Sequence, residues 1–431
     1  MDKSVMNIGI CGAGTVAGGL VGLLKKNQQL IAARIGHPIE IVQIGSRNVP
    51  KQPVFDGIAF TDNIFEVAEN PKVDVLVELI GGTDDALALV GTALRAGKSV
   101  VTANKALIAE HGQELFQLSD QVGQQLAFEA SVAGSIPIIK VLRESLAGNE
   151  IEAVVGIING TTNFILSQMS KPGSSVSFGQ ALAEAQRLGY AEADPTFDVE
   201  GLDAAHKLTI LSAIAFGTRL RFDAIYTQGI QEIQLEDIRF AAELGYRLRH
   251  LGVTRIQEAG IELRVHPTLL DEKEMLAQVD DVMNAVMVMS DAASQTLYYG
   301  PGAGAGPTAS SVLSDLIDIS RGATMPVMGF LPGETRAIPA LPIGQCQTSF
   351  YLRLRVADRP GVLSRITRIL GDYEISIEAL LQKDPEQGIA TIVITTDTVV
   401  EERMDATIDK LESSTDVLEA VIKIRIFSFG G

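Results

Sequence analysis

The chain has 431 residues, which suggests about three domains, and 46% of them are hydrophobic, enough for more than one core. Its formal net charge of −18 at pH 7 argues against nucleic acid and anionic membranes as partners. The longest apolar runs have the length of strands and are interrupted by Gly or charge, so we expect no membrane span. Two cysteines and an N-terminus that enters a strand without a basic leader predict a cytoplasmic protein.

The first predicted strand, residues 6–11, runs into a glycine-rich turn that a helix follows. The turn reads Gly-x-Gly-x-x-Ala from Gly12, in the strand–turn–helix context of the dinucleotide fingerprint. Gly12 permits the tight turn, Gly14 lets the backbone approach a pyrophosphate, and Ala17 lets the helix pack close to the strand. Such turns often only connect elements, but this context favours a dinucleotide site.

The second strand, residues 39–44, is followed by Arg47 where an NAD-specific site usually places an acid. An arginine can pair bidentately with a 2′-phosphate, so we predict NADP, with NAD use as an alternative. The simpler alternative is a solvated arginine in a loop.

Strands and helices then alternate, with strands at 73–80, 99–102 and 125–128 and helices at 84–96 and 106–122. This rhythm predicts a Rossmann-like, doubly wound parallel sheet whose ligand lies at the carboxyl ends of its strands. Lys105 follows one strand end and is therefore expected at the ligand crevice. Residues 129–137 follow another strand end and begin with Glu129. The carboxylate of Glu129 and the accessible carbonyl groups of this segment could bind a hard cation. From the residues alone, the simpler interpretation is a loop that opens a helix over 137–146.

The middle of the chain reads as a second, mainly antiparallel sheet, with strands at 151–158, 261–266, 281–289 and 295–299. A polar turn at 159–163 caps a helix at 164–169, and a further helix spans 178–188. The run 300–308 contains four glycines and leads into a helix at 309–319, with Pro307 near its first position. This run either lies against a bound cofactor or is a tight turn only.

The stretch 189–207 holds five carboxylates and ends on a lysine at the start of an apolar helix, 201–217. In that helix Asp203 and Lys207 are four residues apart, so their side chains share one face. An ammonium beside fixed carboxylates could be a catalytic arrangement, or a solvated acidic loop followed by an ordinary ion pair. After a linker at 322–347, residues 350–426 follow a βαββαβ pattern, which is ferredoxin-like.

Residues 1 to about 325 resemble homoserine dehydrogenase, through six ordered motifs at 12–16, 102–105, 129–132, 159–163, 189–207 and 300–308. The tail resembles an ACT domain, through the run Asp-Arg-Pro-Gly-Val-Leu at 358–363. The family's cofactor turn often ends in Gly where this chain has Ala17, which makes the fingerprint slightly less standard. The resemblance implies interconversion of L-homoserine and L-aspartate 4-semialdehyde with NAD(P).

The resemblance also implies site residues. Lys207 corresponds to the family's catalytic lysine, and Lys105 to a lysine between nicotinamide and substrate. The acidic stretch and polar turn supply substrate-binding candidates, namely Glu192, Asp203, Asp198, Thr161 and Gly160. Cofactor contacts fall on Gly12, Gly14, Thr15, Val16, Arg47, Lys105 and Gly306. A sodium ion is implied at Glu129 and the carbonyl groups of Val132, Gly134 and Ile136.

The chain is thus expected to divide into a Rossmann domain at 1–135, with 300–322 packing back on it, and an α+β catalytic and dimerisation domain at 136–325. A linker at 326–347 and an ACT domain at 348–431 follow. The ACT domain suggests feedback control, with L-threonine as the expected effector or with no regulation as the alternative. We expect a homodimer or homotetramer.

Two other functions agree less well with the sequence. A phosphorylating aldehyde dehydrogenase needs a cysteine nucleophile, but Cys11 lies in the first strand and Cys346 in the linker. An amino-acid sensor with an inactive Rossmann domain is disfavoured because the residues expected at the active site are all present, namely Lys105, Glu192, Asp203 and Lys207.

Overall fold

A computed structural model describes residues 5–49, 52–331, 333–383, 385 and 387–429. The chain forms two compact units, each built from several segments. The first unit contains residues 1–160, 203–225 and 282–338, and the second contains 161–202, 226–281 and 339–431. Within the described ranges, we find no helix with the length and apolar character that a bilayer crossing requires.

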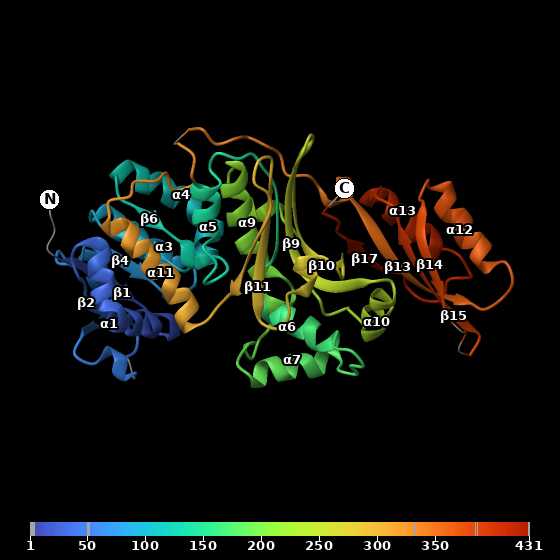
Figure 1. The fold of residues 1–431 in the computed structure, drawn as a ribbon, viewed down its shortest axis with the longest axis horizontal. Helices are drawn as coiled ribbons and strands as arrows, with labels where there is room; N and C mark the ends of the chain where they lie inside the picture. The colour runs from blue at the N-terminus through green and yellow to red at the C-terminus, as the bar shows by residue number, and fades with distance from the viewer. Residues whose placement is uncertain (1–4, 50–51, 332, 384, 386, 430–431) are drawn as a thin grey trace. The chain divides into compact units, whose positions relative to one another are not determined.

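The first unit contains a six-stranded sheet in the order β3-β2-β1-β4-β5-β6, all of whose neighbouring strands are parallel (Figure 1). Its strands are β1 (Met6–Cys11), β2 (Ile39–Gly45), β3 (Ala59–Thr61), β4 (Val75–Glu78), β5 (Ser99–Thr102) and β6 (Leu126–Ala127). The helices between them are α1 (Thr15–Ile35), α2 (Ile64–Glu69), α3 (Asp84–Arg95) and α4 (Lys105–Val122). This is the dinucleotide-binding order, so the predicted Rossmann-like class is confirmed. Strand β3 and helix α2 were not predicted.

Both faces of this sheet are covered, as a parallel sheet requires. Ile8 and Ile10 of β1 are fully buried in a core that they share with α1 and with α11 (Ala305–Ser320). On the other face a Cβ at Gly9 would lie 2.4 Å from a methyl group of Val67 in α2. Helix α11 therefore returns from late in the sequence to complete the Rossmann core.

The remaining elements of the first unit are α5 (Ile138–Lys140), β7 (Ile151–Ile157), α9 (Leu202–Phe216), β11 (Met283–Ser290) and β12 (Ser294–Pro301). Strand β11 pairs antiparallel with both β7 and β12. Helix α9 is buried along nearly its whole length, which fits its apolar composition. The helix predicted over 137–146 is α5 followed by a π-helical turn, Val141–Ser145. The helix predicted from 309 begins earlier, at Ala305, because Pro307 lies in the first turn, where no backbone N–H is needed.

The second unit contains a long antiparallel hairpin, β9 (Tyr246–Gln257) and β10 (Gly260–Asp271), paired along its whole length. Strand β9 was not predicted, and β10 extends beyond the predicted 261–266. The other elements of its first two segments are α6 (Gly160–Met169), α7 (Phe178–Arg187), α8 (Thr196–Val199), β8 (Tyr226–Thr227) and α10 (Leu235–Glu243).

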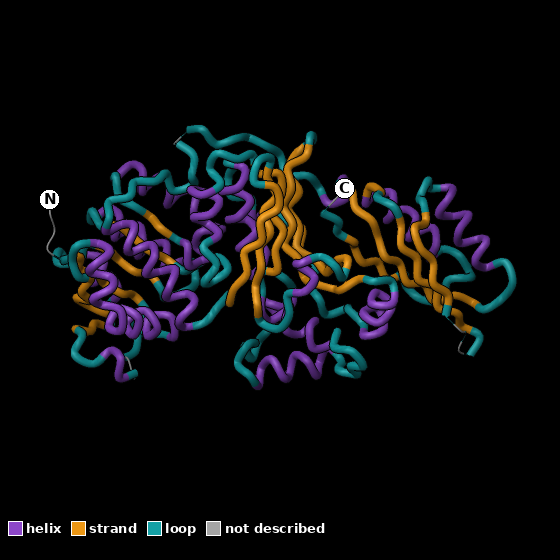
Figure 2. The backbone as a smooth tube through the Cα atoms, in the orientation of Figure 1, coloured by secondary structure: helices purple, strands orange, loops and turns teal. Residues whose placement is uncertain are grey.

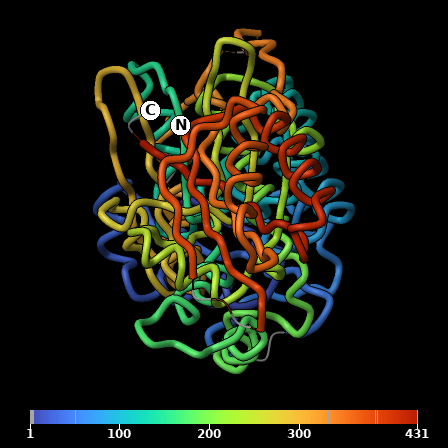
Figure 3. Tube along the Cα trace, turned by 90° about the vertical axis from the view of Figure 1, so that its right-hand side faces the viewer, coloured from blue at the N-terminus to red at the C-terminus, as the bar shows by residue number. Residues whose placement is uncertain are grey.

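The C-terminal module of the second unit has the sheet order β17-β13-β15-β14, as a ferredoxin-like fold requires. Its elements are β13 (Gln347–Ala357), α12 (Val362–Asp372), β14 (Ile377–Gln382), β15 (Ile389–Thr396), β16 (Val399–Val400), α13 (Glu401–Glu412) and β17 (Ile422–Ile426). Alternate residues of β13 share one core with both helices, shown in purple in Figure 2. The chain of this module can be followed in orange and red in Figure 3. Strand β17 pairs with β10 at two positions, Thr268 with Arg425 and Leu269 with Ile426.

Candidate active site and cofactor site

The turn between β1 and α1 has the geometry that its glycines predict. Gly12 has φ +105°, and a Cβ there would lie 2.4 Å from the carbonyl oxygen of Leu79, so only glycine fits. At Gly14 no described atom lies within 4 Å of where a Cβ would be, so the backbone can be approached from outside. Ala17 is fully buried against the sheet. The turn therefore leaves room for a phosphate at the N-terminus of α1.

A cavity of about 450 Å³ opens beside this turn, between the ends of β2, β3 and β4. Arg47 and Ser46 line it from the end of β2, as the sequence predicts for a 2′-phosphate contact. Two acids that sequence reasoning missed, Asp62 and Asp85, line the same cavity. They follow β3 and begin α3, and their arrival at the cavity depends on the fold rather than on any local motif.

The N-terminus of α11 lies beside α1. A Cβ at Gly19 would lie 2.4 Å from the carbonyl oxygen of Ala305, so the two helices approach each other at backbone distance. Gly304 precedes α11 with φ +122°, a conformation that favours glycine. The run of glycines at 300–306 is therefore more than a connector, since it brings the start of α11, including Gly306, to the dinucleotide turn.

The first turn of α9 carries the carboxylate around which a polar cluster is built. Asp203 is 4% exposed, and its Oδ2 accepts hydrogen bonds from Lys207 Nζ at 2.6 Å and from Asn159 Nδ2 at 2.8 Å. Its Oδ1 lies 3.1 Å from Lys105 Nζ. Lys207 Nζ also donates to the carbonyl oxygen of Ile158 at 2.7 Å. We call these four side chains (Lys105, Asn159, Asp203 and Lys207) the Asp203 cluster.

Local sequence explains how each member reaches the cluster. The spacing of four residues on α9 places Asp203 and Lys207 on one face, as predicted. Lys105 is the first residue of α4, which Asn104 caps by accepting the backbone N–H of Leu107 at 3.1 Å. Asn159 lies two residues after the end of β7. The hydrogen bond from its side-chain amide to Asp203 was not predicted.

The Asp203 cluster contains one carboxylate for two ammonium groups. Burial alone would raise the pKa of Asp203, but the charges of Lys207 and Lys105 outweigh it and hold that pKa well below its usual value. Asp203 is therefore ionised at any working pH, and the three charged groups together carry a net charge of about +1. On the same helix, burial lowers the pKa of His206, whose Nε2 lies 3.0 Å from Glu110 Oε1.

Residues 12–129 match the family "Homoserine dehydrogenase, NAD binding domain", residues 137–317 match "Homoserine dehydrogenase", and residues 350–415 match "ACT domain". The chain is 49% identical to homoserine dehydrogenase from Pseudomonas aeruginosa over 98% of each chain. It is similar to the crystal structure of a homoserine dehydrogenase from Thiobacillus denitrificans, with a TM-score of 0.94 and 48% identity over 99% of each chain. A hyperthermophilic archaeal homoserine dehydrogenase in complex with NADPH matches 74% of this chain and 99% of its own, with a TM-score of 0.63 and 28% identity.

The chain belongs to the homoserine dehydrogenase family. It is an oxidoreductase that acts on a CH–OH group with a nicotinamide cofactor, and it carries an ACT domain. The predicted family and enzyme class are thereby confirmed. Both cysteines are buried, and burial raises the pKa of Cys346 to about 11 and that of Cys11 further, so neither is a thiolate nucleophile of an aldehyde dehydrogenase.

For a member of the homoserine dehydrogenase family, the predicted substrate residues fall in both compact units. Gly160 ends a segment of the first unit, while Thr161, Glu192 and Asp198 belong to the second. Within the second unit Thr161 Oγ1 lies 3.0 Å from Asp198 Oδ2 and 2.8 Å from the carbonyl oxygen of Tyr190. Glu192, also in the second unit, is an exposed residue.

The loop predicted to bind a cation mainly organises the backbone around it. The Glu129 carboxylate accepts the backbone N–H groups of Ile139 and Lys140 at 2.9 and 2.8 Å, which caps α5. The carbonyl oxygen of Gly134 accepts from Ser311 Oγ at 2.6 Å, and that of Ile136 accepts from the N–H of Ile138 at 2.8 Å. Within the described part of the chain, no three His, Cys, Asp or Glu side chains converge as a metal site.

A second carboxylate is buried in the crevice at the end of β4. Glu78 Oε1 accepts the backbone N–H of Ile80 at 2.9 Å, and its Oε2 accepts from the hydroxyl group of Thr102. Burial raises the pKa of Glu78, although these hydrogen bonds oppose the shift. Its place at the end of β4 was predicted as part of a strand, without a role.

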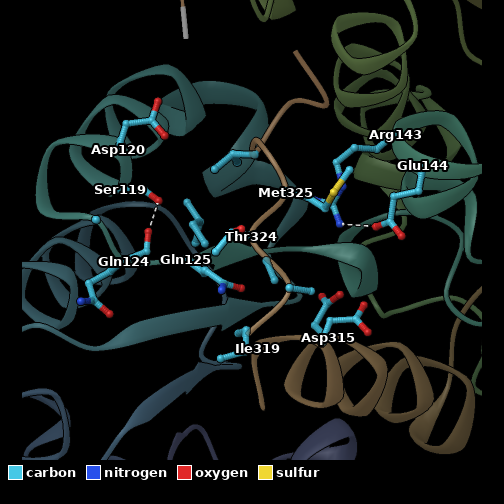
Figure 4. Close-up of a pocket in the computed structure, with 16 residues that line it drawn as sticks. Ser119, Asp120, Gln124, Gln125, Arg143, Glu144, Asp315, Ile319, Thr324 and Met325 are labelled. Carbon is cyan, nitrogen blue, oxygen red and sulfur yellow. Dashed lines mark hydrogen bonds and ion pairs between the residues drawn. The ribbon is translucent and has the colours of Figure 1, made fainter. Parts of the chain in front are cut away.

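A further cavity, of about 270 Å³, lies in the first unit between the end of α4, β6 and the end of α11. Figure 4 shows Arg143, Glu144 and Asp315 around it, with an ion pair of 3.0 Å between Arg143 and Glu144. None of the predicted site residues lines it. It is therefore separate from the cofactor turn and from the Asp203 cluster.

Proposed function

We propose that the chain interconverts L-homoserine and L-aspartate 4-semialdehyde, with Lys207 as the group that donates and accepts the proton. The observation that carries this proposal is the Asp203 cluster, in which one buried carboxylate holds two ammonium groups 2.6 and 3.1 Å away. This cluster and the dinucleotide turn belong to the same compact unit.

In aldehyde reduction, NADPH supplies the hydride when bound. The electron pair of the carbonyl bond moves to oxygen, and the ammonium group of Lys207 gives that oxygen its proton. In alcohol oxidation the same nitrogen, as the amine, takes the hydroxyl proton. Lys105 adds a second positive charge that stabilises the oxygen as negative charge develops there.

Asp203 organises both lysines and leaves limited capacity for other partners. Its carboxylate already accepts from Lys207 and Asn159 and faces Lys105, out of roughly four acceptor positions. The substrate ammonium is proposed to be held by charge-assisted hydrogen bonds to Glu192, which is exposed, and to the remaining acceptor capacity of Asp203. Thr161, with Gly160 and Asp198, is the candidate group for the rest of the polar substrate.

The enzyme is proposed to prefer NADP over NAD. Arg47 at the end of β2 offers a planar fork for a 2′-phosphate, while Asp62 in the same cavity could accept from a free 2′-hydroxyl. Arg47→Ala should lower kcat/KM with NADP by about tenfold or more and leave kcat/KM with NAD within about twofold. Equal loss with both cofactors would contradict the assignment of Arg47 to the phosphate.

A monovalent cation near Glu129 is proposed as a structural element. Each carbonyl oxygen of Val132, Gly134 and Ile136 has two lone pairs, so a hydrogen bond to one still leaves the other for a cation. A carbonyl-rich donor set suits Na⁺ or K⁺ better than a transition metal. Thermal unfolding in sodium, potassium and tetramethylammonium salts at equal ionic strength tests this role.

Regulation and assembly complete the proposal. The effector is proposed to be L-threonine acting through the ACT domain at 348–431, in a cytoplasmic homodimer or homotetramer. Strand β17 of that domain pairs with β10, so deleting the domain would also remove the strand that pairs with β10. Turnover of the full chain at rising L-threonine concentration is therefore the better test, and unchanged turnover would remove the effector assignment.

The decisive experiment measures homoserine-dependent formation of NADPH by fluorescence. The full chain should show it, and Lys207→Met should lower kcat by about 10²- to 10⁴-fold, the usual contribution of a proton-transfer group. Lys105→Met serves as the comparison, with a smaller loss because its role is electrostatic. Wild-type kcat in Lys207→Met would refute the catalytic role, and absence of any activity in the wild type would favour a sensor.

A further inference from the structure

A polar cavity of about 220 Å³ lies in the second unit, where the β9–β10 hairpin meets the strands of the ACT module. None of the described residues that line it is Asp or Glu, although the chain as a whole has 53 acidic and 35 basic residues. Its polar lining includes Arg255, Gln257, Arg264, Thr348, Ser349 and Thr398. A cavity of this composition in an acidic protein favours an anion.

The charges behind the lining leave this cavity with a positive balance. Glu262 is fully buried and pairs with Arg255 Nη2 at 2.9 Å and with Arg264 Nη2 at 2.8 Å. Two guanidinium groups therefore share one carboxylate. Burial and the nearby charges of Arg425 and Arg264 keep the pKa of His266 well below its usual value, so this histidine is neutral. The neighbouring Arg425 is matched by Glu401, and an excess of about one positive charge remains.

Arg255 is the arginine that a ligand can reach. Its side chain is 27% exposed, whereas that of Arg264 is 1% exposed. One edge of the Arg255 guanidinium bonds Glu262, while its Nε is buried and has no hydrogen-bond partner among the described residues. A guanidinium group has five N–H donors in a planar fork, and this one has donors to spare.

The ACT module supplies hydroxyl groups from other sides of the same cavity. Thr348 Oγ1 donates to the carbonyl oxygen of Ile426 at 2.6 Å, which orients it. Ser349 Oγ lies 3.4 Å from Thr398 Oγ1. Only one hydroxyl of such a pair is the donor, so the other keeps its proton for another acceptor. Arginine and hydroxyl donors around one cavity are the groups that bind an oxyanion.

We propose that this cavity binds a small metabolite through one oxyanion group, a carboxylate or a phosphate, held by Arg255 and by the free hydroxyl proton of the Ser349–Thr398 pair. The bound anion would connect strand β9 with β13 and β17. Strands β10 and β17 pair at only two positions, so an additional connection there stabilises the junction of the ACT module with the hairpin. The cavity contains no residue of the 358–363 run that carries the ACT resemblance.

Thermal unfolding of the full chain tests the proposal, in a dilute amine buffer without phosphate. One arm adds L-threonine, a second adds inorganic phosphate, and sodium chloride at equal ionic strength gives the baseline. We expect at least one of the two anions to raise Tm above that baseline, because a ligand that binds only the folded state stabilises it. A response to L-threonine alone identifies a carboxylate site, and a response to phosphate alone identifies a site for a phosphorylated metabolite.

The Arg255→Gln variant tests whether Arg255 binds the anion, and it leaves Glu262 paired with Arg264. It should raise the half-saturating anion concentration by about tenfold or more, since a charge-assisted bond is lost. Arg247→Gln is the matched control, because Arg247 also lies on β9, is 37% exposed and pairs with a carboxylate, Asp280, but does not line the cavity. The control should keep the wild-type response.

A second variant covers the case in which Arg255→Gln does not fold. Ser349→Ala removes a hydroxyl group without breaking an ion pair and should weaken the response by about threefold. The proposal is overturned if neither anion shifts the wild-type Tm beyond the salt baseline. It is also overturned if the folded Arg255→Gln or Ser349→Ala variant keeps the full wild-type response.

Discussion

Two clusters of lysine and carboxylate, each with a buried aspartate, lie in the same compact unit, and they have opposite charge balances. The Asp203 cluster has one carboxylate for two ammonium groups. The second, which we call the Lys140 cluster (Glu129, Lys140, Asp315 and Asp318), has three carboxylates for one ammonium group. Lys140 Nζ bonds Asp318, lies 3.5 Å from Asp315 Oδ1 and donates to Ser314 Oγ at 2.6 Å.

The two clusters respond to burial in opposite directions. In the Asp203 cluster the lysines outweigh burial and lower the pKa of the carboxyl group. In the Lys140 cluster, burial outweighs the charges of Lys140 and of the nearby Arg143 and raises the pKa of Asp315 to about 6. Burial and the charge of Asp315 together raise the pKa of Glu129 to about 8. The number of ammonium groups per carboxylate therefore decides whether a buried cluster offers spare positive charge or shared acidic protons.

The difference in charge balance distinguishes a cluster suited to catalysis from a cluster that stabilises the fold. Spare positive charge is what an oxygen needs while it gains negative charge in hydride transfer. The Lys140 cluster instead ties α11 to the capped turn at Glu129, since Asp315 accepts the backbone N–H of Glu129 at 2.9 Å. Substitutions in the two clusters should accordingly change different quantities, activity in one and stability in the other.

The largest effect is expected from Asp203→Asn. The amide keeps the shape of the carboxylate but removes the charge that holds Lys105 and Lys207, so kcat/KM for homoserine should fall by about 10³-fold. Steady-state kinetics at saturating NADP measures this loss. Asp318→Asn is the matched control, because it removes a carboxylate from Lys140 and should leave kcat/KM within about twofold. Comparable losses in both variants would erase the distinction between the clusters.

The sequence predicted the parts of the site that depend on local spacing. The turn at Gly12 and Gly14 was recognised from a short local motif, and the pair Asp203 and Lys207 from a spacing of four residues. The βαββαβ pattern of the tail was recovered for the same reason, since its strands alternate clearly. By contrast, Lys105 reaches Asp203 across about a hundred residues. Its place after a strand end predicted a position at the ligand crevice, but not its contact with Asp203.

The sequence did not predict elements in which a buried polar residue is paired with a residue far away in the chain. Strand β9 contains Arg249 and His250, both buried, so its pattern does not alternate between apolar and polar. Arg249 is accommodated by Asp280 at 2.7 Å, a partner that no local pattern reveals. The acids Asp62 and Asp85 at the cofactor cavity were missed because they come from separate loops.

The next effect concerns stability. Lys140→Met should leave the buried carboxylate of Asp315 without its ammonium partner and lower the unfolding free energy by about 3 kcal/mol. Turnover per folded molecule should stay within about twofold of wild type, because Lys140 is not in the Asp203 cluster. Denaturant unfolding and active-site titration measure the two quantities. Lys26→Met, at an exposed lysine, is the control and should change stability by less than about 0.5 kcal/mol. A stable Lys140→Met variant would contradict the structural role.

The pH dependence of stability should show the same cluster. An acid whose pKa is raised on folding stabilises the protein fully below its unfolded pKa and loses that contribution as pH rises through its folded pKa. For Asp315 this window runs from the ordinary pKa of 3.8 to about 6, and for Glu129 from the ordinary pKa of 4.5 to about 8. The contribution of the Lys140 cluster therefore decreases as pH rises through these windows.

Asp315→Asn should reduce that decrease. The asparagine keeps an acceptor for the N–H of Glu129 but no longer binds a proton, and one cause of the raised pKa of Glu129 is removed. Relative to wild type, the variant should gain about 2 kcal/mol between about pH 4.5 and about pH 7. Unfolding free energies across this range measure it. Parallel curves for variant and wild type would mean that Asp315 is ionised throughout.

The smallest expected effect is that of Asn159→Ala, which removes the neutral member of the Asp203 cluster. Its amide donates to Asp203 Oδ2 at 2.8 Å, the same oxygen that accepts from Lys207. Loss of one hydrogen bond to a charged group costs roughly 1.5 kcal/mol, so kcat/KM should fall by about tenfold, far less than in Asp203→Asn. The two lysines still hold the carboxylate by charge, and only the orientation of one oxygen is loosened.

The ratio of these two losses tests what organises the cluster. If charge dominates, Asp203→Asn exceeds Asn159→Ala by about two orders of magnitude, and adding salt has little effect because the pair of Asp203 and Lys207 is shielded from solvent. If Asn159→Ala instead equals Asp203→Asn, then the direction of the carboxylate matters as much as its charge. In that case the excess of ammonium over carboxylate would not by itself distinguish a catalytic cluster from a structural one.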